Sequence, residues 1–369
     1  MNIPFVGGAY LGRSPNVNAQ ECVNLYPVVD REGGKILALY PTPGLKVWHD
    51  FAIKYETVRG LHAMDDYIYA VIGDTVYRLD VNKSVTTLTG TLGTTSGQIW
   101  TENNPTQIMI VDIEGGKGYI VSGTAVSQIT DPDFPIPTSL TYQDGYFIVT
   151  EKDTEKIWIS ALNNGTSWDA LDYGSAEGAP DKAKAVIMDH RELWIYGDDT
   201  GEVFYNSGDP DFPFERIQGS FQQVGIGAPK SVVRLDNSLF WLDDGNQIRR
   251  ADGYTPMIIS TPQISYQIDQ YNTVNDAIGF SYVHEGHSFY VITFPSANRT
   301  WVYDAATGFW HRRSSFPDDP DSRWRANCYA YFDHKHLVGD FEHGKIYELD
   351  HNLYTDDGNS IKAVRTTQA

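Results

Sequence analysis

The residue types best suited to metal binding gather late in the chain, where histidines alternate with carboxylates. The histidines are His334, His336, His343 and His351, and the acidic residues among them are Asp333, Asp340, Glu342 and Asp350. Imidazole and carboxylate groups bind metals, and His334 and His336 would share one face of a strand. The run falls in predicted turns of an acidic protein, where exposed side chains are common. We therefore expect neither a metal site nor a cofactor.

Carboxylates could also act as the acid and base of a glycosidase, which uses two of them on either side of the scissile bond. The chain has 48 acidic residues, and their spacing singles out no such pair. The sequence also lacks a serine nucleophile elbow, a phosphate-binding glycine loop and a paired-cysteine motif. The sequence thus predicts no catalytic residue, and we expect that the protein is not an enzyme.

The basic residues have one concentration, between positions 299 and 325. It consists of Arg299, Arg312, Arg313, Arg323 and Arg325. Arginine is enriched in protein interfaces, so this group could dock an acidic neighbouring subunit. Solvated surface is the alternative interpretation. We predict a protein-protein interface at these five residues.

Charge and hydropathy limit the classes of partner. The formal net charge is −20, which disfavours general binding to nucleic acid, because phosphate binding depends on Lys and Arg. No stretch approaches the roughly 20 apolar residues of a membrane span, and residues 1–10 have no secretory signal pattern. Cys22 and Cys328 are far apart in sequence, and we expect both to be reduced thiols.

A repeated pattern supplies the elements that must hold these residues. A short apolar strand, a turn and a second apolar strand recur, with equivalent positions 39 to 50 residues apart. These positions are Ile68, Ile108, Phe147, Leu193, Leu239, Phe289 and Leu337. A period of 40–50 residues is typical of propeller blades. The repeat predicts an all-β β-propeller of seven four-stranded blades, with six as the alternative, and an extended N-terminal arm.

The pattern also predicts strand bounds and domain limits. The first blade is expected at 58–64, 67–73, 75–81 and 84–91, and the fourth at 183–189, 193–197, 202–207 and 214–221. The last blade has three strands, at 327–332, 336–340 and 345–349, and an unpaired edge there would invite aggregation. Either 360–366 or 35–40 could supply its fourth strand, and we favour 35–40. We assign 1–34 to the arm and 35–369 to the propeller.

Three local patterns have structural interpretations. Ile264, Ile268, Tyr271 and Asn275 have helical spacing, which predicts a short helix at a blade junction. The segment from Ile159 to Trp168 resembles a degenerate Asp-box, a turn that stabilises blades in sialidases. In a kelch-like stretch, Tyr303 and Trp310 are expected to pack between blades while Asp304 holds a turn through its side chain.

Several segments together resemble one family, the packaged-DNA stabilisation proteins, or tail hubs, of short-tailed bacteriophages. Residues 24–27 (NLYP) and 41–45 (PTPGL) carry the resemblance near the N-terminus. Residues 276–282 (DAIGFSY), 285–287 (EGH), 289–290 (FY), 294–295 (FP), 300–304 (TWVYD) and 310–311 (WH) continue it. We add Asn24 and Tyr26 to the predicted interface on this ground.

The resemblance implies a structural protein of the virion tail, made in the host bacterial cytoplasm. Family members form a ring, expected to be a hexamer, beneath the portal-adaptor ring, where they close the channel, retain packaged DNA and mount a tail needle or spike. DNA would pass without specific binding. Relatives continue beyond the position of Ala369, so this chain is a shorter variant or a truncated form. A glycan- or receptor-binding propeller and a propeller glycosidase are the alternatives.

Overall fold

The computed structural model describes residues 7–11, 19–29, 36–176, 178–209 and 212–367. Its regular structure is strand apart from α1 (Pro262–Asp269) and the 3-10 turn η1 (Pro229–Ser231). The all-β prediction is therefore confirmed. Parts of the predicted arm (1–6, 12–18 and 30–34), together with Lys35 and residues 368–369, lie outside the described residues.

Four-stranded antiparallel units follow one another along the chain. Within each unit, every strand pairs with the next one in sequence, to which a short connection joins it. The first three units are β7 (Val58–Met64), β8 (Tyr67–Ile72), β9 (Thr75–Asp80) and β10 (Val85–Thr91); β11 (Ile99–Asn103), β12 (Ile108–Asp112), β13 (Lys117–Ser122) and β14 (Ala125–Gln128); and β15 (Pro137–Gln143), β16 (Tyr146–Glu151), β17 (Lys156–Ala161) and β18 (Asn164–Ser175).

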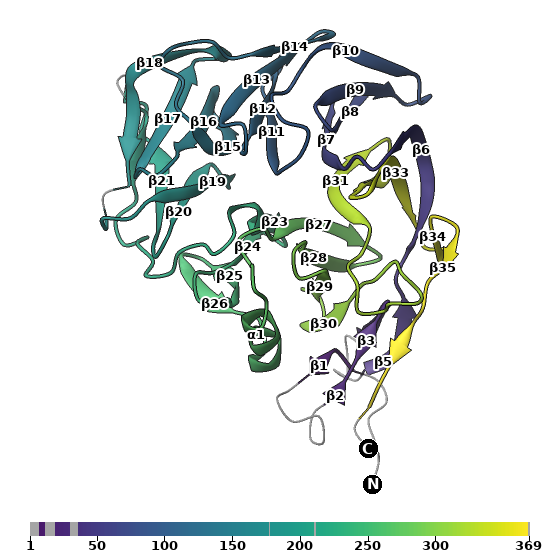
Figure 1. Cartoon of the computed structure of the whole chain (residues 1–369). Helices are drawn as coiled ribbons and strands as arrows, with labels where there is room; N and C mark the ends of the chain where they lie inside the picture. Colours follow the sequence, from purple (N-terminus) through teal and green to yellow (C-terminus); the bar gives the residue numbers. More distant parts are fainter. Residues whose placement is uncertain (1–6, 12–18, 30–35, 177, 210–211, 368–369) are drawn as a thin grey trace.

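The remaining units complete a ring in which the first strand of each lies nearest the middle (Figure 1). They are β19 (Ala183–Asp189), β20 (Glu192–Gly197), β21 (Gly201–Asn206) and β22 (Phe214–Arg216); β23 (Val233–Leu235), β24 (Ser238–Leu242), β25 (Ile248–Asp252) and β26 (Thr255–Ile258); β27 (Ile278–His284), β28 (His287–Phe294), β29 (Arg299–Asp304) and β30 (Phe309–Arg312); and β31 (Ala326–Phe332), β32 (Lys335–Asp340), β33 (His343–Asp350) and β6 (Gly44–Lys54).

The repeat positions found in the sequence all lie on second strands. Each of Ile68, Ile108, Phe147, Leu193, Leu239, Phe289 and Leu337 is at most 2% exposed. The first and fourth predicted blades match β7–β10 and β19–β22 to within a few residues, apart from the early end of β22. The sequence spacing therefore located the repeated unit correctly, because one apolar second strand is buried in every copy.

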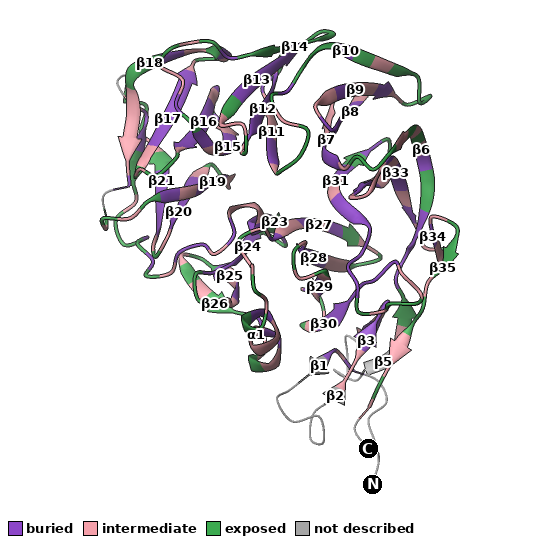
Figure 2. Ribbon diagram, in the orientation of Figure 1, coloured by how far each residue is buried: buried purple, intermediate pink, exposed green. Residues whose placement is uncertain are grey.

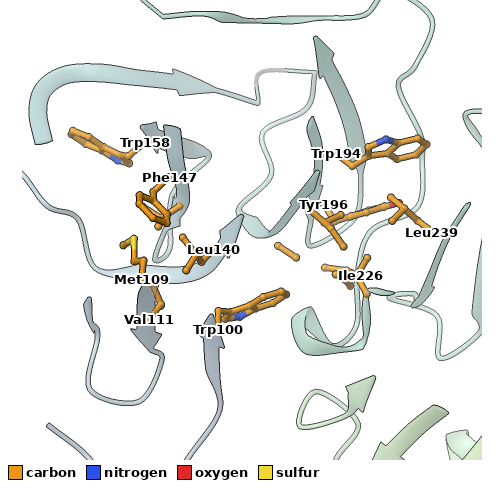
Figure 3. Packing of buried hydrophobic residues seen from close by; sticks show 14 of the residues in the cluster. Trp100, Met109, Val111, Leu140, Phe147, Trp158, Trp194, Tyr196, Ile226 and Leu239 are labelled. Atoms are coloured by element: carbon orange, nitrogen blue, oxygen red, sulfur yellow. The ribbon is translucent and has the colours of Figure 1, made fainter. Parts of the chain in front are cut away.

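The core consists of hydrophobic clusters within and between neighbouring units. The largest runs from β11 to β25, and Figure 3 shows Trp100, Leu140, Trp194 and Tyr196 from successive units facing a shared interior. Figure 2 shows buried residues concentrated on the inner strands, while the outer strands β6 and β10 carry many exposed ones. Neighbouring units are thus held together by side-chain packing, whereas a closed barrel is held together by one continuous sheet.

Ring closure differs from the prediction. The last unit receives its fourth strand from β6, which pairs antiparallel with β33 and places Leu45 opposite Leu349. The favoured candidate, 35–40, is wrong, because β5 (Ile36–Pro41) pairs with β4 (Leu25–Val29) instead. The other candidate, 360–366, contributes Ser360 to β35 (Asn359–Ser360) and forms β36 (Val364–Arg365), which pairs with β3 (Cys22–Val23), so it does not pair with β33 either. The strand that closes the ring therefore comes from the N-terminal side, but it is the strand that follows the predicted one.

The physical reason lies in length and side-chain placement. β6 spans 11 residues, enough to run along the whole of β33, and it buries Leu45 and Trp48. Trp48 joins the cluster shared by the first and last units. At the outer edge of β6, β34 (Thr355–Asp356) adds in parallel and pairs with β35 (Asn359–Ser360). A two-stranded sheet of β1 (Tyr10–Leu11) and β2 (Ala19–Gln20) lies beside α1.

The predicted helix is present but shorter than its pattern. α1 begins after Thr261, whose side-chain oxygen accepts a hydrogen bond from the Ile264 backbone, with Pro262 in the first turn. Ile264 and Ile268 are buried. Tyr271 lies beyond the helix end but still packs in the same cluster. The apolar spacing therefore predicted which side chains pack in the core correctly, but it extended beyond the end of the helix.

Candidate functional site

The N-terminal arm meets the two final units at one junction, and the residues singled out in the sequence gather there. β3 lies parallel to β30, with Val23 opposite Arg312, and β36 pairs with the other edge of β3. The unit β27–β30 thereby becomes a six-stranded sheet. We call this region, where the arm and the C-terminal strand lie against the last two units, the arm junction (Figure 1).

Asn24 fixes the arm at this junction. Its φ of 57° is in the left-handed region, which Asn tolerates better than most residues. Its side-chain amide donates to the carbonyl oxygens of Ser314, at 2.9 Å, and Lys362, at 3.0 Å. Its side-chain oxygen accepts from the Ser314 backbone at 3.0 Å. One buried side chain therefore connects the arm, the exit of β30 and the C-terminal segment.

Tyr26 packs into the core beneath the same junction. It is 2% exposed, and its ring centroid lies 5.1 Å from that of His287 and 5.3 Å from that of Phe289. Burial raises the pKa of the Tyr26 hydroxyl above its usual value, so it stays protonated. Tyr26 thus serves as an aromatic anchor within the chain.

Two arginines at the end of β30 face the arm from inside the molecule, Arg312 as its last residue and Arg313 directly after it. Arg312 forms ion pairs with Asp321, at 2.6 Å, and with Glu21, at 3.3 Å. Arg313 is 1% exposed and donates to the carbonyl oxygen of Pro43 at 2.6 Å. Its guanidinium lies 3.5 Å from the centroid of the Trp324 ring, and burial lowers its pKa.

The other arginines extend the network to the last unit. Arg325 donates to both Asp340 and Glu342 at 3.1 Å and lies over the Phe316 ring. Arg323 donates to the side-chain oxygen of Asn327 at 3.1 Å. Arg299 is partly exposed and donates to the carbonyl oxygens of Asn298 and Asp321. The structure therefore brings all five arginines together around the loop that joins β30 to β31.

This arrangement corrects the predicted basic patch. Docking and solvation both require accessible guanidinium groups, yet Arg312, Arg313, Arg323 and Arg325 are each at most 8% exposed. Asn24 is also buried, at 2%. The expectation of an exposed patch is wrong for these residues, because aromatic rings and carbonyl oxygens of the chain itself cover them. Their observed contacts are internal.

Sequence reasoning also missed partners of these arginines. Asp340 and Asp356 are buried, and Asp356 accepts from the Leu45 backbone and the Ser315 hydroxyl. Burial raises the pKa of Asp356. The available signal was the aromatic residue beside the basic ones at Trp324, since a cation that stacks on a ring can be buried.

Two members of the histidine run come together, since the rings of His336 and His351 both lie beside that of His284. His334 is exposed in a turn, while the His336 ring stacks on Tyr329. The His351 and His284 rings stack with centroids 3.2 Å apart. Within the described residues, no group of three His, Cys, Asp or Glu side chains is placed to hold a metal ion. Cys22 and Cys328 are free, as expected for reduced thiols.

The two turn predictions are confirmed. Asp304 accepts from the backbone of Ala306 at 3.0 Å and from the Thr307 hydroxyl, while Trp310 is buried with its ring 5.0 Å from that of Tyr303. In the Asp-box-like turn, the side chain of buried Trp168 donates to the Gly165 carbonyl at 3.0 Å. Both patterns serve the fold.

Solved structures with similar folds are propellers of diverse function. Virginiamycin B lyase from Staphylococcus aureus is 12% identical, with a TM-score of 0.53 over 82% of this chain and 97% of that one. The extracellular domain of the hybrid two-component system BT4673 from B. thetaiotaomicron is 10% identical, with a TM-score of 0.54 over 83% of this chain and 40% of that one. The Pan2 WD40 domain of Neurospora crassa is 7% identical, with a TM-score of 0.50 over 84% and 94%. These likenesses show the fold alone.

Sequence comparison is more specific. Among curated protein sequences, none matches this chain. The family model described as "Bacteriophage P22 Gp10, beta-propeller" matches residues 1–354, which include the arm junction except for its C-terminal strand. No helix in the described part of the chain is long and apolar enough to cross a membrane. The match covers nearly the whole sequence, and the chain therefore belongs to the packaged-DNA stabilisation family of bacteriophage β-propeller proteins.

Proposed function

We propose that this protein is the tail hub of a bacteriophage virion, which closes the portal channel, retains packaged DNA and mounts a tail needle or spike. The observation that carries the proposal is the family match over residues 1–354. Two of the segments that carry the family resemblance, those of Tyr26 and Phe289, also pack together beneath the arm junction.

We infer that the four-stranded units are seven blades, the last closed by β6. Each repeat position from Ile68 to Leu337 lies on the second strand of its own unit, which supports this count. Copies of this wedge-shaped propeller are proposed to form a hexameric ring against the portal-adaptor ring in the virion tail. The net charge of −20 suits a conduit that DNA crosses without specific binding.

We also propose that the protein is not an enzyme. Three buried carboxylates, those of Asp112, Asp243 and Asp340, form ion pairs with arginines at 2.6 to 3.1 Å. Carboxylates that form such ion pairs stabilise the fold, whereas a glycosidase needs two carboxyl groups that face a bound sugar. This observation supports a structural role over the glycosidase alternative.

The test is assembly on a portal-adaptor complex from the same phage. Purified protein should co-sediment with that complex in a fixed ratio, and particles assembled without it should lose their DNA to added nuclease. Adding the protein to such particles should restore nuclease resistance. Absence of binding together with unchanged DNA retention would overturn the proposal.

One observation favours a second candidate function, binding of a glycan or receptor. A groove of about 610 Å³ on the side of the β31–β32 turn is lined by Tyr331, His336 and Asp236. Tyr331 is 53% exposed, and its ring lies 5.1 Å from that of His336. Exposed aromatic rings beside polar groups suit sugar recognition. A glycan array on which the Tyr331→Ala variant loses signals given by the intact protein would support this function, and an array without hits would remove it.

A further inference from the structure

A cavity of about 420 Å³ lies among the first strands of four units. Residues of β7, β11, β27 and β31, together with Lys230 of η1, line it, and Figure 1 places these strands around the middle of the ring. Leu61, Ile99 and Phe280 give the cavity apolar walls. Its volume is within the range of about 300–1,000 Å³ that is usual for small-molecule sites. The charged groups in the cavity decide what it could hold.

Lys230 is the first of these groups. Its ammonium lies 4.0 Å from the centroid of the Trp100 ring, and no carboxylate of the described residues lies within 4.0 Å of it. Glu102, the acid that influences it most, lies 3.8 Å from Arg234 instead. Burial lowers the pKa of Lys230 to about 8. The cavity therefore contains a cation without a close counter-ion.

Arg323 is the second cation. It is 5% exposed, its guanidinium lies 4.2 Å from the Phe341 ring centroid, and its polar contacts are the side-chain oxygen of Asn327 and the carbonyl oxygen of Trp324. Of the two carboxylates that influence it, Asp340 is paired with Arg325, and Asp276 belongs to the same cavity wall. In the described part of the chain, Arg323 has no carboxylate at ion-pair distance.

Asp276 adds an unused acceptor to the cavity wall. One oxygen of its carboxylate accepts from the Ser296 backbone at 2.7 Å, whereas the other, Oδ1, is buried and has no hydrogen-bond partner among the described residues. A buried acceptor without a donor costs free energy, on the order of 1–3 kcal/mol. Asp276 therefore favours a ligand that brings a donor group.

Arg59 in the same wall shows the contrast. Its guanidinium donates to the carbonyl oxygens of Gly73, Thr94 and Gly97 and pairs with Asp112 at 3.0 Å. Arg59 is thus fully provided with partners. Lys230 and Arg323 lack such partners, although taking a charge out of water is costly unless it is paired.

We propose that the central cavity binds a small organic oxyanion that also carries a hydroxyl group, such as a hydroxy acid or a phosphate monoester. The oxyanion is held by Lys230 and Arg323, the hydroxyl donates to Asp276 Oδ1, and the carbon skeleton lies against the apolar walls. This site goes beyond the proposed hub function, and its test needs no assembly partner.

The experiment measures binding of inorganic phosphate and of citrate to the full chain by calorimetry, with sodium chloride at matched ionic strength as the reference. Both probes should bind in a saturable manner, and at least one of the variants Lys230→Met and Arg323→Met should weaken binding tenfold or more. Lys117→Met, at an exposed lysine of β13, should bind like the parent chain. Absence of saturable binding by both probes, or affinities unchanged in both cavity variants, would overturn the proposal.

A stability measurement separates loss of binding from loss of folding. Without ligand, Lys230→Met should melt no lower than the parent chain, because it removes a cation that has no counter-ion. Citrate should raise the melting temperature of the parent chain and of Lys117→Met, and it should raise that of Lys230→Met less. An equal shift in all three proteins would also contradict the proposal.

Discussion

Asp340 shows how this acidic chain buries a charge. Its side chain is 0% exposed, and it accepts hydrogen bonds from Arg325, from the Tyr347 hydroxyl at 2.7 Å and from the Glu342 backbone at 2.8 Å. These donors replace the water that the carboxylate loses. The network joins β32, β33 and the loop before β31 in the unit that closes the ring.

Replacing Asp340 by Ala should therefore destabilise the protein strongly. The substitution leaves Arg325 with only the partly exposed Glu342 as its ion partner and leaves the buried Tyr347 hydroxyl without its acceptor, which should cost about 3 kcal/mol. Urea denaturation at pH 7 measures the change in the free energy of unfolding. Asp66→Ala, at an exposed turn, is the matched control and should change it by less than about 0.5 kcal/mol. A loss below about 1 kcal/mol at Asp340 would contradict this view of the network.

His311 presents the opposite case, a titratable group that folding keeps neutral. It is fully buried, and neither ring nitrogen has a hydrogen-bond partner among the described residues. Burial, followed by the nearby Arg313, lowers the pKa of His311 from 6.5 to about 3. The unfolded chain therefore binds a proton between these two values while the folded chain does not, so stability falls as the pH drops from about 6.5 toward 3.

His311→Leu should reduce this acid sensitivity. The leucine removes the titrating ring from an apolar site, so the melting temperature should fall less between pH 7 and pH 4.5 than it does in the parent chain. His334→Asn, at an exposed turn where Asn accepts the positive φ, is the control and should keep the parent slope. Parallel slopes in all three proteins would exclude His311 as the source.

At this scale, sequence reasoning succeeded where a residue acts on its neighbours in the chain. The Asp304 turn and the packing of Trp310 depend on contacts a few residues away, and both were predicted. The arginines from 312 to 325 were assigned to the surface because composition alone treats charge as exposed. The side chains of Arg312 and Arg313 instead bind Glu21 and Pro43, which lie about 270 to 290 residues away in sequence.

At the scale of elements, the apolar pattern of the sequence located the second strands but did not identify β6 as the strand that closes the ring. Second strands such as β8 and β20 are continuous apolar runs, which stand out in any sequence. β6 buries only Gly44, Leu45 and Trp48 and lies far from its partner β33 in sequence, so nothing local marks it as a member of the last unit. The sequence analysis assigned the fourth strand of the last unit to the more apolar β5 instead.

Asn24 controls docking of the arm, and two substitutions separate its contributions. Asn24→Ala loses the side-chain hydrogen bonds and places a Cβ-bearing residue without local hydrogen bonds at φ 57°, so it should cost about 3 kcal/mol. Asn24→Gly loses the same bonds but tolerates this φ, so it should cost about 1 kcal/mol less. Denaturant titration gives both values, and an Ala variant as stable as the Gly variant would contradict the assignment of backbone strain.

At the scale of the whole molecule, stability should depend on keeping the ring closed. Lys46 on β6 and Glu348 on β33 are paired across the closing strands. Paired antiparallel residues have Cα atoms about 4.5–5.5 Å apart, which suits a disulfide. A bond between cysteines at these positions would link residues 302 apart in sequence.

The Lys46→Cys/Glu348→Cys variant should therefore be stabilised more than a locally crosslinked one. Arg78→Cys/Thr86→Cys joins paired residues of β9 and β10 that are only 8 apart in sequence. Chain entropy favours the long crosslink by about 3 kcal/mol. Thermal unfolding under oxidising and reducing conditions compares the two, and equal gains would mean that the ends of the ring do not separate early in unfolding.

The pairing of β6 with β33 also determines when the newly made chain can close its ring. β6 leaves the ribosome early, but the first residue of its partner β33 follows Lys54 by 289 positions. At bacterial synthesis rates of about 5–20 residues per second, that interval is roughly 15–60 s. Throughout it, β6 has no β33 edge to pair with, and the first unit has no neighbour on one side. The nascent protein therefore passes through a long open state before its two ends meet.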